Sequence, residues 1–178
     1  MAISKKILND TKSFINEVFS DNSEIELPVK IEHIIKKMKI DLVNYTFDDE
    51  ISGVLVLNDN QSTIGINQSH SDVRKRFTMA HELGHFVLHK DKGNMFMDKV
   101  LFRKSSQEYS SQDVQLEKEA NYFAANILMP EKAVRMQFAN SLNDFYDDSN
   151  IQNLAEKFKV SSSAMTYRLI NLGLIDIK

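Results

Sequence analysis

The sequence predicts an α+β fold, in which a small antiparallel sheet packs on a histidine-bearing helix with further helices before and after it. Strand-like segments are confined to residues 40–67, whereas apolar residues recur at helical spacing on both sides of this stretch. With 178 residues, of which 42% are hydrophobic and 26% charged, the chain suits one compact unit. We expect a main domain over residues 1–149 and a helical C-terminal segment over residues 150–178, packed on it.

Two helices and a strand are expected before residue 46. Apolar residues at helical spacing predict an amphipathic helix over residues 4–19, which ends at the polar segment 21–24. Pro28 suits the first turn of a second helix, whose apolar face lies within residues 31–38. The segment IDLVNY at 40–45 then has the composition of a strand.

A β-hairpin is expected directly before the histidine helix. The strand-like segments 52–57 and 62–67 flank a short polar turn. Ser71 is a suitable N-cap for the helix that follows, and the polar segment 91–94 ends it. A glycine in the middle of a helix costs about 1 kcal/mol relative to alanine. We therefore expect Gly84 to mark the close approach of another backbone.

Helices dominate the second half of the chain. The polar segment 104–113 predicts a mobile loop, and the apolar spacing after it predicts a helix over 114–130. A short helix is expected over 133–139. The last segment predicts two helices joined by a short turn, a helix-turn-helix-like unit whose second helix ends at Gly173.

Composition argues against several functional classes. The net charge is -3 and the basic residues are spread along the chain, so the footprint of a nucleic-acid-binding protein is absent. Without cysteine, a transition metal has to be held by His, Asp or Glu side chains. No segment approaches the roughly 18 apolar residues of a membrane span, and polar residues interrupt the segment after Lys5 and Lys6 before it resembles a signal peptide. We expect a soluble protein of the cytoplasm.

The segment RFTMAHELGHFVLHK at 76–90 contains the pattern H-E-x-x-H. Residues four positions apart share one face of a helix, so His81 and His85 can direct ring nitrogens at one ion, at the ~2.0–2.1 Å that zinc requires. Glu82 lies one position round the helix, where it suits a general base better than a ligand. The alternative is an exposed helix that carries these residues by chance. The apolar residues around the motif argue against it, because buried imidazoles and carboxylates need a partner such as a metal.

A catalytic zinc site usually has a third protein ligand. His89 shares the helix face but lies another ~5.4 Å along the axis beyond His85, so we expect a supporting or structural role for it. A carboxylate on the later helix is the better candidate. Glu117 lies on the face predicted to pack inward, whereas Glu119 is rotated about 200° away from it, so we choose Glu117. Asn121, one turn further on, can accept a hydrogen bond from the free ring nitrogen of a ligand histidine. The alternative for Asn121 is a simple amide on the helix surface.

The segments RFTMAHELGHFVLH and EKEANYFAANILMP together resemble the ImmA/IrrE family of metallo-endopeptidases, HEXXH zinc proteases of bacteria, phages and mobile elements. The resemblance implies a zincin-like core and a bound Zn²⁺. It also implies ligation through the glutamate of a Glu-x-x-x-Asp motif, which matches Glu117. Asn121 stands where that motif has aspartate, so the hydrogen-bond acceptor is kept and the charge is lost.

The expected reaction is hydrolysis of a peptide bond by Zn²⁺ and a general base. The metal lowers the pKa of a water towards ~7 and polarises the scissile carbonyl, while Glu82 takes the proton of the water and passes it to the leaving amine. Tyr109, in the predicted loop, and Tyr122 are candidates for stabilising the tetrahedral oxyanion. Core packing is the alternative role for Tyr122.

The expected substrate is a polypeptide in extended form. It can add to a sheet edge at residues 53–57, where Gly53, Val54 and Leu55 would contact it. Members of the resembled family typically cleave a helix-turn-helix repressor encoded beside them. The resemblance therefore implies such a repressor as the substrate, and the release of genes of a phage, a mobile element or a stress response.

The C-terminal unit is poorly suited to DNA. Its basic residues are only Lys157, Lys159 and Arg168, and the acidic segment 144–150 just before it repels phosphate. We expect it to pack on the core or to contact the repressor. Two alternatives to an enzyme stay open: a non-catalytic, metal-containing regulator that binds a repressor or DNA, and a sequence-specific DNA-binding protein.

Overall fold

The computed structural model describes residues 3–20, 25–48, 50–58, 61–99, 110–140 and 148–176. Within these ranges the chain forms seven helices and four strands. In order they are α1 (Lys5–Val18), α2 (Ile31–Lys37), β1 (Asp41–Tyr45), β2 (Ile51–Val56), β3 (Thr63–Asn67), α3 (Asp72–His89), β4 (Met95–Lys99), α4 (Ser111–Leu128), α5 (Glu131–Asn140), α6 (Asp148–Phe158) and α7 (Ser162–Asn171). The α+β class is therefore confirmed.

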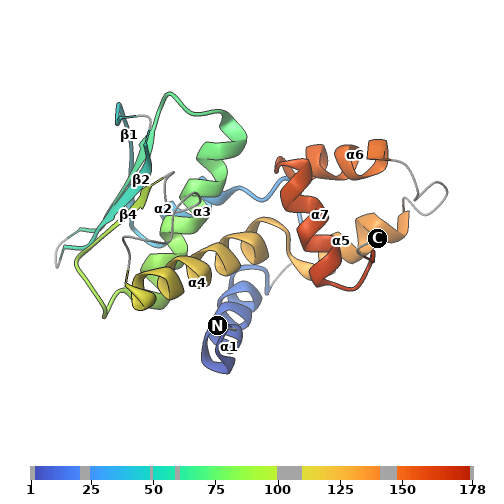
Figure 1. Ribbon diagram of the computed structural model, residues 1–178, viewed down its shortest axis with the longest axis horizontal. Helices are drawn as coiled ribbons and strands as arrows, with labels where there is room; N and C mark the ends of the chain where they lie inside the picture. Colours follow the sequence, from blue (N-terminus) through green and yellow to red (C-terminus); the bar gives the residue numbers. More distant parts are fainter. Residues whose placement is uncertain are drawn as a thin grey trace.

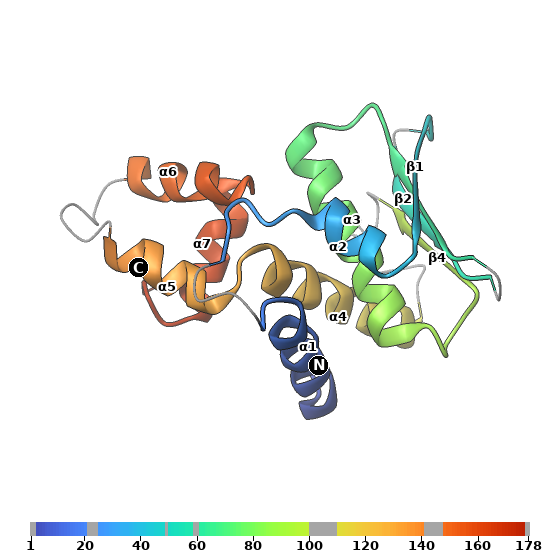
Figure 2. The same ribbon diagram turned by 180° about the vertical axis from the view of Figure 1, so that it is seen from behind.

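The elements form two parts that meet at the ends of α3 and α4 (Figure 1). At one end of the molecule the sheet lies against α3, and α4 crosses α3 with α1 beside it. At the other end α5, α6 and α7 form a small helical group, which the reverse view in Figure 2 also shows. The apolar core runs from the inner face of the sheet through α3 and α4 into α6 and α7.

The sheet is mixed, in the order β1-β3-β2-β4. β2 pairs antiparallel with β3, so the predicted hairpin is confirmed. β1 pairs parallel with β3, so the expectation of an antiparallel sheet is wrong at this strand. The cause is the position of β3: β1 and β2 run in opposite directions across a short connection, and β3 inserts between them.

β4 is not among the strands predicted from the sequence, and it changes the edge of the sheet. It pairs antiparallel with β2, with Val54 opposite Met97 and Leu55 opposite Phe96. The expectation that residues 53–57 form a free edge is therefore wrong, because β2 has a partner on each side. Among the described residues, β4 and β1 are the edge strands.

Gly84 marks a close approach of α3 and α4. A Cβ placed on Gly84 would lie 3.2 Å from both the Cα and the carbonyl oxygen of Ala120. The expected close approach of a backbone is confirmed, and the partner is α4. The apolar residues that give α4 its helical spacing are all buried: Ala120, Phe123, Ala124, Ile127 and Leu128.

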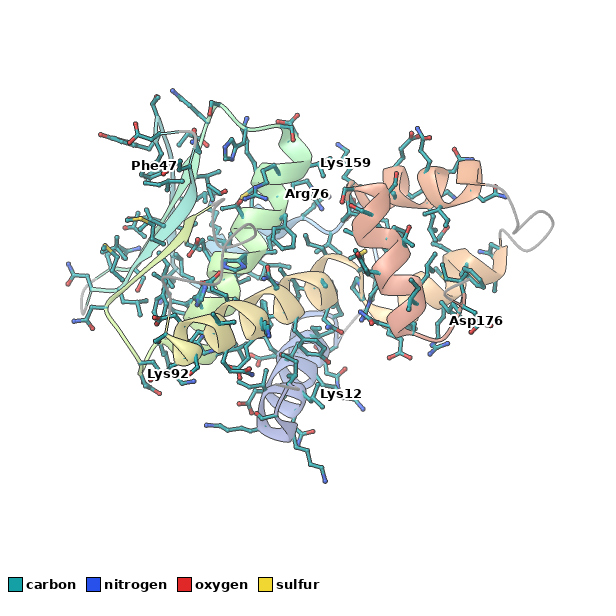
Figure 3. All side chains as sticks on the ribbon, in the orientation of Figure 1. Lys12, Phe47, Arg76, Lys92, Lys159 and Asp176 are labelled. Carbon is teal, nitrogen blue, oxygen red and sulfur yellow. The ribbon has the colours of Figure 1, made fainter. Side chains whose placement is uncertain are left out.

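Two buried arginines connect the C-terminal helices to the rest of the molecule. Arg76 of α3 donates to the carbonyl oxygen of Val29 at 2.9 Å and to that of Lys159 at 3.4 Å. Lys159 lies in the turn between α6 and α7, and Figure 3 labels both residues at this junction. Arg168 of α7 donates to the carbonyl oxygen of Met129, just after α4, at 3.0 Å. The partners are backbone groups in every case.

Several element boundaries differ from those predicted. Pro28 lies two residues before Lys30, the N-cap of α2, so its placement in the first turn is wrong. The carbonyl of Val29, between them, accepts from Arg76 and from the backbone N–H of Ile31. α4 begins earlier than expected, at a capping box formed by Ser110 and Asp113. Gly173 follows α7 with a φ of +64°, as expected of the residue that ends a helix. In the part of the chain that the structure describes, no helix is both long and apolar enough to cross a membrane.

Candidate metal centre

α3 brings two histidines to one point. Ser71 caps the helix as predicted, since its side chain accepts from the backbone N–H of Arg74 at 3.3 Å. His81 and His85 then lie one turn apart, and each is only 1% exposed. Their Nε2 atoms are 3.0 Å apart. The helical spacing thus becomes a pair of convergent nitrogen donors.

Glu117 reaches the same point from α4. Its Oε2 lies 3.2 Å from Nε2 of His81, and its Oε1 lies 3.1 Å from Nε2 of His85. One ligand atom from each of the three residues lies within 4.8 Å of the other two. The structure therefore brings together the three residues predicted to be metal ligands.

The three donors fit a divalent cation. Ligand atoms about 2.0–2.1 Å from a tetrahedral zinc ion lie roughly 3.3 Å from one another, close to the separations in this cluster. Two imidazoles and one carboxylate also leave a fourth position open, as in catalytic zinc sites. Oδ1 of Asn121 lies 3.2 Å from Nδ1 of His81. Asn121 accepts the Nδ1–H, so the lone pair of His81 is at Nε2 and faces the cluster.

The pKa shifts favour the metal-binding forms. Burial lowers the pKa of His85 from 6.5 to about 4, although its hydrogen bond with Glu117 acts in the opposite direction. Burial raises the pKa of Glu117, but hydrogen bonds with His81 and His85 outweigh it and lower the pKa from 4.5 to about 2. At neutral pH His85 is therefore neutral and Glu117 is ionised, which are the states that ligate a metal.

His89 extends the cluster instead of joining it. Its Nδ1 lies 3.1 Å from Nδ1 of His85, and its Nε2 lies 2.9 Å from Oε2 of Glu119. Oε1 of Glu119 accepts from the side-chain amide of Gln115 at 2.9 Å. His89 is completely buried and Glu119 is 5% exposed.

The expectation that Glu119 points away from the packed face of its helix is wrong. Glu117 and Glu119 both reach α3, Glu117 at His81 and His85 and Glu119 at His89. A signal was present in the sequence: a buried histidine at position 89 needs a partner for each of its two ring nitrogens.

Glu82 lies between α3 and the sheet. Its side chain is completely buried. A Cβ placed on Gly53 of β2 would lie 3.3 Å from Oε1 of Glu82 and would collide with the side chain of Thr78. Gly53 therefore gives the sheet room to pack on this part of α3, whereas the sequence analysis expected it to contact substrate.

Aromatic rings and a groove border the cluster. Phe96 of β4 stacks on the His85 ring, with 4.7 Å between centroids and 18° between planes. Phe77 lies beside His81, with 6.1 Å between ring centroids. A groove of about 610 Å³ runs between α3, α4 and α7, and both Phe77 and Asn121 line it. None of the three ligand residues lines this groove, but Phe77 and Asn121 each contact His81.

The remaining candidates are placed elsewhere. Tyr122 lines a different groove, between α1, α4 and α5, whose lining contains none of the three ligands. This position gives no support to an oxyanion role for Tyr122. Tyr109 lies outside the described residues. Val54 and Leu55 lie within β2, which is paired on both sides.

Comparison with known proteins gives a family and a fold. Residues 30–170 match the model of the family Peptidase_M78, described as the IrrE N-terminal-like domain. Comparison with curated proteins gives no match. Among solved structures, the chain is similar to a Mycobacterium tuberculosis transcriptional regulator, with a TM-score of 0.59 and 17% sequence identity. The likeness covers 90% of this chain and 46% of that one, so the chain spans about half the length of the regulator and resembles it in fold alone.

Proposed function

Because the chain belongs to the ImmA/IrrE family, whose domain model matches residues 30–170, we propose that it is a zinc-dependent endopeptidase that cuts its substrate at a specific site. Membership of this family indicates a metallopeptidase-like role. One observation carries the proposal: His81, His85 and Glu117 converge from two helices in the arrangement of a metal site. Glu82, the residue after the first ligand, supplies a carboxylate for proton transfer.

The proposed reaction divides between the metal and the chain. Bound zinc supplies a Lewis acid for the scissile carbonyl and lowers the pKa of a water to about 7. Glu82 accepts the proton of the attacking water and delivers it to the leaving amine. Asn121 and His89 hold the two ligand imidazoles by their outer nitrogens. The burial of Glu82 keeps bulk water away from its carboxylate during the transfer.

We place an extended substrate along β4 instead of β2. An edge strand can pair with the main chain of a peptide and align it without requiring a particular sequence. β4 is an edge strand among the described residues, and its Phe96 stacks on the ligand His85. The groove between α3 and α7 then receives a further part of the substrate, so the C-terminal helices contribute to its recognition.

The proposed substrate is a helix-turn-helix transcriptional repressor in the cytoplasm. The family supports it, because its members typically cleave such repressors and release genes of a phage, a mobile element or a stress response. The charge of the chain supports contact with a protein more than with DNA, since the net charge is -3. Lys157 and Lys159 give α6 and the turn after it little basic surface.

The test compares wild type with Glu82→Gln, both loaded with zinc and incubated with a peptide library made from a digested bacterial proteome. We expect the wild type to produce new peptide ends, identified by mass spectrometry, and the variant to produce none while it binds zinc equally well. Glu131→Gln, the same change at an exposed position of α5, should cut like the wild type. Equal cutting by Glu82→Gln would refute the mechanism. Zinc binding without cutting by the wild type would favour the non-catalytic regulator.

A further inference from the structure

A continuous series of hydrogen bonds leads away from the candidate metal centre on the His85 side. It runs from Nδ1 of His85 to Nδ1 of His89 over 3.1 Å, and from Nε2 of His89 to Oε2 of Glu119 over 2.9 Å. Oε1 of Glu119 holds the amide of Gln115 at 2.9 Å. Both histidines are buried, so no solvent competes for their ring nitrogens.

Only one pair of tautomers for His85 and His89 is consistent with ligation by His85 through Nε2. A neutral imidazole carries one N–H, so the proton of His85 has to be on Nδ1. That N–H points at Nδ1 of His89, which must then be the acceptor. The proton of His89 is therefore on Nε2, where it donates to the carboxylate of Glu119. If His89 carried its proton on Nδ1, two N–H groups would face each other.

We propose that Glu119 is a positioning residue for the metal centre, which acts through His89 to hold His85 in the tautomer and orientation that present Nε2 to the ion. The carboxylate prefers an N–H over a lone pair, so it fixes the proton of His89 at Nε2 and thereby makes Nδ1 of His89 an acceptor. Partners of this kind behind a ligand histidine commonly change metal affinity about 10- to 100-fold when they are removed.

The two ligand histidines differ in how they are held. His81 is held directly, by the neutral amide oxygen of Asn121, which is exposed. His85 is held through a second imidazole by a buried carboxylate. α4 therefore supplies a ligand, Glu117, the outer partner of His81, and the carboxylate that contacts His89, the outer partner of His85. The geometry of the metal site therefore depends on how α4 packs on α3.

The first experiment measures zinc affinity by competition with a chromogenic chelator. We expect Glu119→Ala to weaken binding by about 10- to 100-fold, and Glu119→Gln, which keeps an acceptor oxygen without the charge, to fall between it and wild type. Glu131→Gln and Glu131→Ala on the exposed surface are the matched controls and should bind as wild type does. Circular dichroism checks that each variant is folded before the titration.

The second experiment needs no substitution. In the zinc-loaded wild type labelled with ¹⁵N-histidine, long-range ¹H–¹⁵N spectra should show His85 protonated at Nδ1 and His89 protonated at Nε2 alone. A purely structural role for Glu119 would leave the tautomer of His89 unchanged in Glu119→Gln, whereas we expect a mixture of tautomers there.

Three results would overturn the inference: wild-type affinity in both Glu119 variants, a proton on Nδ1 of His89 in the wild type, or no zinc binding at all. The inference rests on the metal site of the proposed function but not on peptide cleavage. Peptide cutting with unchanged affinity in the Glu119 variants would defeat the inference and leave the proposed function intact. Weakened zinc affinity in the Glu119 variants of a protein that cuts no peptide would support the inference and contradict the proposed function.

Discussion

The contact between α3 and α4 differs in kind from the contact between the core and the C-terminal helices. Along α3 and α4, specific side chains meet specific side chains: His81 meets Asn121, and His89 meets Glu119. At the C-terminal helices, Arg76 and Arg168 reach across to backbone carbonyls. The first contact depends on the chemistry of both partners, whereas the second depends on one side chain and on the path of a backbone.

This difference separates two tasks. The α3–α4 contact has to present defined lone pairs to an ion, so each partner must be a particular residue type. The arginine contacts have to hold a helical group in place, and any residue supplies a carbonyl oxygen. We therefore expect substitutions at the first contact to change metal binding, and substitutions at the second to change stability alone.

The largest expected effect comes from removing a ligand at the first contact. Glu117→Ala removes the carboxylate that lies 3.1–3.2 Å from both ligand nitrogens. Zinc affinity should fall by more than the roughly 10- to 100-fold expected for an outer partner. Elemental analysis and chelator competition measure it. Arg168→Met, at the second contact, should keep wild-type affinity for zinc. Equal affinities in Glu117→Ala and Arg168→Met would contradict the distinction between the two contacts.

The second-largest expected effect is the loss of stability at the first contact, between α3 and α4, as the pH falls. The pKa of His85 is about 4 in the folded chain and ordinarily 6.5, so between these values the unfolded chain binds a proton that the folded chain does not. The stability of the metal-free protein is thus complete above 6.5 and falls as the pH approaches 4, by an amount on the order of 3 kcal/mol.

Urea unfolding at pH 7 and at pH 4.5 measures this loss. His85→Asn cannot titrate in that range, so its stability should change less between the two pH values. Glu117 contributes to stability in a separate, lower pH range. Its pKa is lowered from 4.5 to about 2 in the folded chain, so its contribution is lost as the pH falls between these values. The same pH dependence in wild type and His85→Asn would rule out His85 as the cause.

The second contact is tested by Arg76→Met. The change removes two hydrogen bonds from a charged donor, to the carbonyl oxygens of Val29 and Lys159, which costs about 1–3 kcal/mol. Chemical denaturation should show this loss, with zinc affinity unchanged in the folded protein. Arg135 also donates to a carbonyl oxygen, that of Leu172, but is exposed, so Arg135→Met should cost less than about 0.5 kcal/mol. A drop in zinc affinity for Arg76→Met would show that the two contacts are coupled.

The smallest expected effect is at the point where α3 and α4 come close. Gly84→Ala adds a methyl group 3.2 Å from backbone atoms of Ala120, which cannot move aside as a side chain could. The gain of about 1 kcal/mol in helix propensity offsets part of an overpacking cost of about 1–3 kcal/mol. We expect a net loss near 1 kcal/mol in thermal unfolding. A more stable Gly84→Ala protein would show that the helices have room to separate.

The sequence predicts the first contact well because its information is local. The spacing of His81 and His85, the glycine at 84 and the face of α4 that carries Glu117 all follow from helical geometry. Asn121 follows from the same geometry, one turn beyond Glu117. Each of these inferences needs only the position of a residue on its own helix.

What the sequence does not predict depends on packing between elements. The role of Glu119 requires knowing that His89 of α3 lies beside it in the folded chain. β4 is as long as β1 and β3, but its sequence MFMDK contains no β-branched residue, so its strand signal is weak. Arg76 bonds to carbonyl groups, and a carbonyl carries no sequence signature. The parallel pairing of β1 depends on where β3 inserts.

The order of the ligands along the chain affects the lifetime of the protein in the cell as well as its chemistry. His85 lies in α3, and Glu117 lies beyond β4 in α4. An ion held by both closes a long loop, and the entropy that such closure takes from the unfolded chain grows with loop length. The metal is thus a removable cross-link. Protection of amide protons in α4 from hydrogen exchange should rise with zinc supply, and a chain starved of the ion should be the one that cellular proteases degrade first.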